Sequence, residues 1–271
     1  MSFSSRLRRI QSQKNTVACV GLDPVPERLP APLRDGRLRT EAVRTFCADI
    51  IEATAPYACA FKPNLAFFEA LGPTGLTVLD QVLATVPDDC LVIADAKRGD
   101  IGHSSEAYAQ ALYGALDADA CTVSPYLGRD SVAPFLNHEG RCAFVLARTS
   151  NDGAADLQET CTCDGVPLYR HVARTVSDWS EEADGTAGLV AGATAPEALA
   201  ELRRDAPTLP FLIPGVGAQG GDPAAVVDAA QTPDGPILVN SSRSILYASE
   251  GDDYASAATE AARELRNALR A

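Results

Sequence analysis

Residues 90–105 read CLVIADAKRGDIGHSS, and this stretch contains the structural unit that predicts the rest of the fold. It begins with a short, continuously apolar run, Cys90–Asp95, which is typical of a parallel strand covered on both faces. Charged residues follow at once, and a helical pattern, Ser104–Leu116, comes next. A buried strand, a polar turn and a helix in this order predict one βα unit of an α/β fold.

The same unit recurs along the chain. The other apolar runs are Thr16–Leu22, Ala58–Lys62, Ala120–Ser124, Cys142–Ala147, Gly188–Ala193, Pro210–Pro214 and Pro236–Asn240. The other helical patterns are Thr40–Ala55, Thr74–Thr85, Asp130–Asn137, Pro167–Ser180, Pro196–Asp205, Asp222–Ala230 and Ala255–Leu269. Eight strands, each followed by a helix, predict a (β/α)₈ TIM barrel, for which about 250 residues are typical. A doubly wound open sheet is the alternative, although such sheets usually have fewer strands.

Composition narrows the class of protein. With 46% hydrophobic and 22% charged residues among 271, the chain is expected to fold, and no linker divides it, so we expect a single domain over residues 1–271. No apolar stretch approaches the roughly 18 residues of a membrane span. The net charge of −13 argues against binding to nucleic acid or anionic membranes. Only three of the 23 basic residues are lysines, an Arg bias that either a GC-rich genome or adaptation to salt explains.

The eight cysteines do not form an obvious disulfide framework. Most lie in or beside apolar runs, where Cys behaves as a small buried hydrophobe. Cys161 and Cys163 form a C-x-C pair without a second pair at zinc spacing, so no metal site is expected. We expect free thiols in a reducing cytoplasm. The first residues carry no secretion signal and predict a short helix with Leu7 and Ile10 on one face.

In a barrel of this kind, functional residues lie at the carboxyl ends of the strands. Two of the three lysines, Lys62 and Lys97, fall there. Asp95 and Lys97 are two residues apart on an extended chain, so their side chains should point the same way, and Asp100 follows after a glycine. Alternating carboxylates and amines at close range can hold a Lys protonated as a general acid. A surface cluster of salt bridges is the alternative.

Two glycine- and serine-rich stretches follow the last two predicted strands. PGVGAQGGD begins at Pro214, and NSSRS begins at Asn240. Glycines such as Gly215 let backbone N–H groups approach an anion, and loops seven and eight commonly bind a substrate phosphate in these barrels. Arg243 would supply a cationic fork and Gln219 a neutral donor. The pattern predicts a phosphate site.

Taken together, DAKRGDI after Ala94, VGLDP before Val25, FKPN at 61–64 and PGVGAQGGD resemble orotidine 5′-phosphate decarboxylase, most closely its longer bacterial and archaeal subgroup. The resemblance spans nearly the whole chain and keeps the order of the motifs. It implies decarboxylation of orotidine 5′-monophosphate to uridine 5′-monophosphate in de novo pyrimidine biosynthesis, in the cytoplasm, with no cofactor and no metal.

The resemblance also implies roles for individual residues. Lys62, Asp95, Lys97 and Asp100 would form a charged tetrad in which Lys97 protonates C6 of the pyrimidine as carbon dioxide leaves. Asp23 would bind a ribose hydroxyl, and Lys62 would also contact the ribose.

Other residues would bind the base and the phosphate or complete a neighbouring site. Ser150 corresponds to the pyrimidine-binding serine, while Gln219 and Arg243 would hold the phosphate. Asp100, Ile101 and Ser104 would reach the site of a second subunit, so the resemblance implies a homodimer with shared active sites.

Two other functions remain open. The first is a magnesium-dependent decarboxylase or aldolase of the same superfamily that acts on a sugar phosphate. The second is a non-catalytic nucleotide-binding barrel, against which the intact charged tetrad argues.

Overall fold

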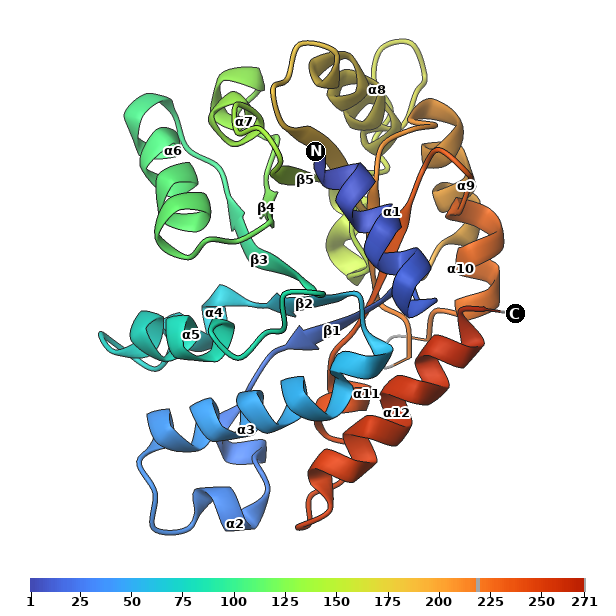
Figure 1. The fold of residues 1–271 in the computed structure, drawn as a ribbon. Helices are drawn as coiled ribbons and strands as arrows, with labels where there is room; N and C mark the ends of the chain where they lie inside the picture. The colour runs from blue at the N-terminus through green and yellow to red at the C-terminus, as the bar shows by residue number, and fades with distance from the viewer. Residues whose placement is uncertain (218–219, 271) are drawn as a thin grey trace.

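The protein, described by a computed structural model at residues 1–217 and 220–270, is built around eight parallel strands. They form a closed barrel in the order β1 to β8, in which β8 pairs with β1, so the predicted (β/α)₈ barrel is confirmed (Figure 1). The strands are β1 Ala18–Leu22, β2 Ala60–Pro63, β3 Leu91–Arg98, β4 Ala120–Val123, β5 Cys142–Arg148, β6 Thr186–Ala191, β7 Phe211–Pro214 and β8 Ile237–Ser241.

Helices surround the barrel, and the predicted helical segments all appear among them (Figure 1). The α-helices are α1 Phe3–Lys14, α2 Ala31–Arg34, α3 Arg39–Thr54, α4 Leu65–Glu69, α5 Gly75–Leu83, α6 Gly102–Ala109, α7 Arg129–Leu136, α8 Leu168–Ser180, α9 Pro196–Asp205, α10 Pro223–Ala230, α11 Arg243–Leu246 and α12 Tyr254–Ala268. The segment predicted as one helix over Ser104–Leu116 is α-helical only to Ala109 and continues as a π-helix, Gln110–Ala115. The short helices α2, α4 and α11 had no counterpart in the sequence pattern, because four or five residues show no periodicity.

Local sequence explains where several of these helices begin. The carboxylate of Asp222 accepts a hydrogen bond from the backbone N–H of Ala224 at 3.1 Å, and Pro223 occupies the first helical turn of α10. Asn64 caps α4 in the same way through the N–H of Ala66. These residues therefore turn the chain from a strand end into a helix at the face where the strands finish.

The strands alternate between an outward side chain, which packs on the helices, and an inward one. On β1, Ala18 and Val20 belong to the core between barrel and helices, whereas Cys19 belongs to the core inside the barrel. Inside the barrel, the early positions of the strands are apolar, for example Leu91 and Ile93 on β3. Because the next inward position on β3 is Asp95, the interior becomes polar towards the carboxyl ends of the strands.

Helix α1 closes the opposite end of the barrel. Its Phe3, Leu7 and Ile10 are buried and belong to the same apolar cluster as the inward strand residues. Phe3 meets Phe144 of β5 edge to face, with ring centroids 5.9 Å apart. The helix expected from Leu7 and Ile10 is therefore present, and it leaves only one end of the barrel for a site.

The cysteines carry the free thiols that their places in the sequence predict. All eight cysteines are unpaired, six of them buried, while Cys161 and Cys163 are exposed. Over residues 1–217 and 220–270, none of the helices combines the length and apolar character that crossing a bilayer requires.

Helix α1 should contribute measurably to stability. Leu7→Ala should lower the free energy of unfolding by about 2–5 kcal/mol, because it leaves a cavity in a closed apolar core. Urea unfolding followed by circular dichroism measures the change. Leu76→Ala on α5, where the side chain is 51% exposed, is the matched control and should change stability by less than about 0.5 kcal/mol. Equal losses in the two variants would show that α1 does not close the barrel.

Candidate active site

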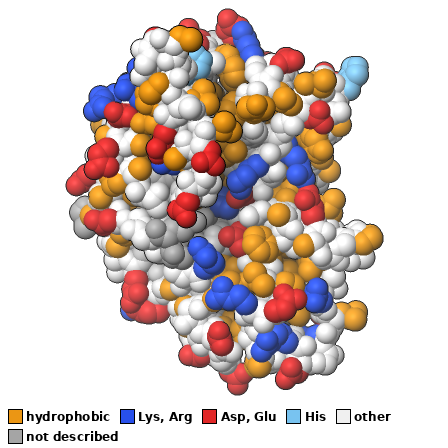
Figure 2. All heavy atoms as spheres, turned by 180° about the vertical axis from the view of Figure 1, so that it is seen from behind, with side chains coloured by type: hydrophobic (Ala, Val, Ile, Leu, Met, Phe, Trp, Pro, Cys, Tyr) orange, Lys and Arg blue, Asp and Glu red, His pale blue; other side chains and the backbone are white. Residues whose placement is uncertain are grey.

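A cavity of about 370 Å³ opens where the strands end, directly above the apolar interior. Each of the eight strands, or the residue directly after it, contributes to its wall. Its polar lining consists of Asp23, Lys62, Asn64, Asp95, Lys97, Thr122, Thr149, Ser150, Asn151, Asn240, Ser242 and Arg243, and its remaining lining of Leu146, Val190, Leu212, Pro214, Gly215 and Val216. Lys and Arg side chains gather near the middle of this face of the molecule (Figure 2). A chain of net charge −13 thus has cationic groups concentrated at one cavity.

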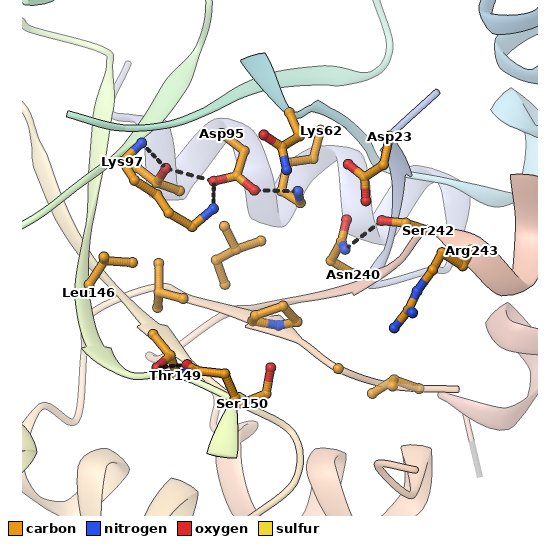
Figure 3. A pocket seen from close by; sticks show the side chains of 18 residues that line it. Asp23, Lys62, Asp95, Lys97, Leu146, Thr149, Ser150, Asn240, Ser242 and Arg243 are labelled. Carbon is orange, nitrogen blue, oxygen red and sulfur yellow. Dashed lines mark hydrogen bonds and ion pairs between the residues drawn. The ribbon is translucent and has the colours of Figure 1, made fainter. Parts of the chain in front are cut away.

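Asp95 lies between the two lysines in the wall of the cavity (Figure 3). Its Oδ2 is 2.7 Å from Nζ of Lys62, and its Oδ1 is 2.6 Å from Nζ of Lys97. The side chains of Lys62 and Asp95 are 5% and 9% exposed, whereas that of Lys97 is 49% exposed. Three of the four predicted tetrad residues therefore form one charged array, in which Lys97 faces the open cavity.

The ionisation of this array follows from burial and from the neighbouring charges. Burial alone would raise the pKa of Asp95, but the ammonium groups of Lys62 and Lys97 outweigh it and hold that pKa well below its usual range. Burial would lower the pKa of Lys62, but the carboxylates of Asp95 and Asp23 outweigh it and raise that pKa. The depressed acid contributes stability above its unfolded pKa of about 4, and the raised base contributes stability below its unfolded pKa of about 10, so the charged pair stabilises the fold between these limits.

Two buried oxygen atoms in the cavity wall lack a protein partner. Oδ1 of Asp23 and Oδ1 of Asn240 are buried and make no hydrogen bond with the described residues. The backbone around Asp23 is held by Tyr247, whose hydroxyl donates to the carbonyl of Asp23 at 3.0 Å and accepts from the N–H of Val25 at 2.7 Å. An unsatisfied buried acceptor costs about 1–3 kcal/mol, so this wall is suited to a ligand with hydroxyl donors.

The loops after β7 and β8 form the side of the cavity away from Lys97. Gly215 has φ +104°, a left-handed conformation that favours glycine, and it lines the cavity with Pro214. The exposed guanidinium of Arg243 lies across the cavity from Lys97 (Figure 3). This side can accept an anionic group at the strand ends where phosphate sites are common. Gln219, the other predicted phosphate ligand, lies outside the described residues.

The end of β5 supplies a third wall. Gln158 makes two hydrogen bonds to Thr149. Its Oε1 accepts from the backbone N–H of Thr149, and its Nε2 donates to the hydroxyl of Thr149, both at 2.8 Å. Ser150, the predicted base-binding residue, lines the cavity beside it. A Cβ at Gly192 would lie 2.9 Å from the backbone nitrogen of Ser150, so the strand end packs closely only because residue 192 is glycine.

Three predicted site residues lie away from this cavity. In the described part of the chain, Asp100, Ile101 and Ser104 do not line it. Asp100 accepts a hydrogen bond from the N–H of Ile101 at 2.8 Å, and the side chain of Ile101 is 61% exposed. Within one chain, therefore, three of the four predicted tetrad residues come together, and Asp100 lies outside the cavity, two residues before α6.

The sequence interpretation missed several residues that the barrel brings into the cavity. Thr122 and Asn240 occupy inward positions near the ends of β4 and β8, and Asn64 and Ser242 follow β2 and β8. The predicted strand Ala120–Ser124 ends at a polar residue, and alternate residues of a strand point to the same side. Counting back two residues from Ser124 would therefore have found Thr122. In contrast, Arg98, the residue after Lys97, does not line the cavity and contacts Glu69 instead.

This fold and site define a (β/α)₈-barrel protein whose charged pocket lies at the carboxyl ends of the strands. Residues 16–259 match the model of the orotidine 5′-phosphate decarboxylase / HUMPS family, and the chain belongs to this family. A relative from Roseiflexus castenholzii, named orotidine 5′-phosphate decarboxylase, is 48% identical over 273 residues, which cover 100% of this chain and 98% of the relative. One of the same name from Variovorax paradoxus is 48% identical over 276 residues, with 100% and 99% covered.

Solved structures agree with this assignment. The OMP decarboxylase of Leishmania donovani is 40% identical with a TM-score of 0.84, covering 100% of this chain and 99% of that one. A putative orotidine-monophosphate-decarboxylase from Toxoplasma gondii is 37% identical with a TM-score of 0.88, covering 99% and 97%. The resemblance inferred from the motifs is confirmed.

Removing the central carboxylate should destabilise the protein. Asp95→Asn leaves the buried Lys62 ammonium without its counter-charge and should lower the free energy of unfolding by about 3–5 kcal/mol at neutral pH. Chemical unfolding measures this loss. Asp80→Asn on the exposed surface of α5 is the control and should change stability by less than about 0.5 kcal/mol.

A second variant isolates the charge effect. The double variant Asp95→Asn/Lys62→Met should be more stable than Asp95→Asn alone, because no unpaired charge remains buried. If the single and double variants are equally unstable, the loss does not come from the uncompensated ammonium.

Proposed function

We propose that the chain catalyses the decarboxylation of orotidine 5′-monophosphate to uridine 5′-monophosphate in pyrimidine biosynthesis, as its relatives' names indicate for them. The observation that carries the proposal is the Lys62–Asp95–Lys97 array in a cavity whose far side holds Arg243. Lys97, a cationic proton donor, lies on one side of the pocket, and Arg243, a cation that can bind an anion, lies on the other. This arrangement suits a phosphorylated substrate that loses a carboxylate.

The proposed reaction requires only protein groups. The bond between C6 and the carboxylate breaks, carbon dioxide leaves, and the electron pair remains on C6. Lys97 then transfers a proton from Nζ to C6 and regains one from solvent. The fixed positive charge of Lys97 stabilises the negative charge that develops on C6. Both oxygens of Asp95 already accept hydrogen bonds from lysines, which supports its role as a holder of Lys97 rather than a metal ligand.

The remaining walls of the cavity supply the proposed substrate contacts. Hydroxyls of the ribose would donate to the unpaired oxygen of Asp23, next to Lys62. Ser150 would bind the pyrimidine. The phosphate would lie against Arg243 and the loop that begins at Pro214 and Gly215, with Gln219 as a further donor.

We also propose that two copies of the chain share their active sites. Asp100, Ile101 and Ser104 would enter the partner's cavity from the start of α6. The position of Asp100 outside the cavity of its own chain supports this, and so does the exposure of large apolar side chains, 61% for Ile101 and 83% for Tyr126. Eight unpaired cysteines support a place in the reducing cytoplasm.

Lys97→Ala tests the proposed proton donor. It should lower kcat for orotidine 5′-monophosphate by about 10²–10⁴-fold or more while the product uridine 5′-monophosphate still binds. Steady-state kinetics and calorimetric titration give the two quantities. Lys14→Ala is the matched control, since Lys14 lies at the end of α1 and contacts Asp89 rather than the cavity. Near-normal turnover by a folded Lys97→Ala variant would refute the assignment.

Arg243→Ala tests the proposed phosphate site. It should lower kcat/KM for the nucleotide by about 10²-fold, or roughly 3 kcal/mol, because a charged hydrogen-bond partner is lost. The nucleoside without its phosphate should hardly be affected, since it presents no charge to Arg243. Comparable losses on both substrates would mean that Arg243 acts on the fold instead.

Subunit exchange tests the shared site. Lys97→Ala and Asp100→Ala should each be inactive, but a mixed dimer would contain one site with both groups intact. Random pairing makes half of the dimers mixed, so activity should recover to about a quarter of the wild-type value. Native mass spectrometry verifies the exchange. If exchanged samples stay inactive, Asp100 does not serve the partner's site.

A further inference from the structure

The backbone of β3 is irregular where it carries the proposed catalytic groups. Its pairing with β4 joins Ala94 to Cys121 and then Arg98 to Val123, so the register shifts across Asp95–Lys97. Lys97 has φ +46°, a left-handed conformation that is unusual for a residue other than glycine. Such bulges redirect side chains and persist only where the surroundings hold them. The bulge in β3 therefore needs a neighbouring group that holds it.

The side chain of Thr122 occupies the space opposite the bulge. Thr122 lies on β4, is 1% exposed and lines the cavity. Its hydroxyl accepts a hydrogen bond from the backbone N–H of Lys97 at 2.9 Å and lies 2.9 Å from Oδ1 of Asp95, to which it donates. The ionised carboxylate of Asp95 can only accept a hydrogen bond, and the backbone N–H of Lys97 can only donate one. The hydroxyl of Thr122 must therefore accept from Lys97 and point its single hydrogen at Asp95. One hydroxyl thus joins the two ends of Asp95–Ala96–Lys97.

We infer that Thr122 is a positioning residue for Lys97, which fixes the strained backbone at Lys97 and the orientation of the Asp95 carboxylate that holds the Lys97 ammonium. The side chain of Lys97 is half exposed and long, so its direction depends on these two anchors. With Oδ1 shared between Thr122 and Lys97, Oδ2 is left to face Lys62. Thr122 acts through Lys97 and not on the reacting atoms.

This inference rests on the proposed decarboxylation, and its test separates the two. Thr122→Val keeps the shape and removes the hydroxyl, while Thr122→Ser keeps the hydroxyl. Thr122→Val should lower kcat by about 10–100-fold with KM changed less than about threefold, because a small misplacement of a catalytic group costs rate rather than binding. Thr122→Ser should restore most of that loss. Thr54→Val is the matched control: its buried hydroxyl bonds the carbonyl of Ile50 on α3, and its removal should leave kcat unchanged.

A second readout does not depend on activity. Amide hydrogen exchange at Lys97, measured by NMR, should accelerate at least about tenfold in Thr122→Val and stay slow in Thr122→Ser, since the hydroxyl is the acceptor for that N–H. If Thr122→Val does not fold, Thr122→Ala and Thr122→Ser form the comparison, since they differ by one hydroxyl. A wild-type protein without decarboxylase activity would refute the proposed function, and amide exchange would still test Thr122.

Three results would contradict a positioning role of Thr122. If the wild type is active and Thr122→Val, or Thr122→Ala, keeps its kcat within about twofold, Thr122 does not position Lys97. If Thr122→Ser loses as much kcat as the variant without a hydroxyl, the methyl group and not the hydroxyl matters. An equal kcat loss in Thr54→Val would show a general effect of removing a buried hydroxyl. Each of these outcomes overturns the inference.

Discussion

The buried carboxylate of Asp95 is the constraint on which the rest of the site depends. It lies near the carboxyl end of a barrel filled below with apolar side chains, where an isolated ion would be very costly. Lys62 and Lys97 make that burial possible, and the carboxylate in turn makes the burial of Lys62 possible. The consequence is a cation, Lys97, that is fixed in direction but still open to the cavity.

The architecture determines where this array can form. The inward side chains at the amino-terminal ends of the strands are apolar, and α1 closes this end of the barrel with Phe3, Leu7 and Ile10. Among the described residues, the other end has inward polar side chains on β2, β3, β4 and β8, with loops free to vary around them. The proposed phosphate site at Arg243 and the array at Lys97 therefore lie at the ends of different strands of one barrel. In the proposed function, a phosphate bound at Arg243 would orient the rest of the substrate against Lys97.

Much of this could be predicted from the sequence, because the physical causes are local. Continuous apolar runs reveal strands buried on both faces, and the scarcity of lysine made Lys62 and Lys97 conspicuous at strand ends. The bulge in β3 could not be predicted, since the φ of Lys97 depends on Thr122 of a different strand. β3 accordingly extends to Arg98, three residues beyond the predicted end at Asp95. The role proposed for Asp100 rests on the resemblance and not on the geometry of one chain, because Asp100 does not line the cavity of its own chain.

The most direct test of the central claim is the release of carbon dioxide from orotidine 5′-monophosphate by purified protein, measured with and without EDTA. The account predicts carbon dioxide and uridine 5′-monophosphate in equal amounts at a rate that EDTA leaves unchanged, because Lys97 and not a metal stabilises the developing charge. No release, or release that EDTA abolishes and magnesium restores, would contradict it.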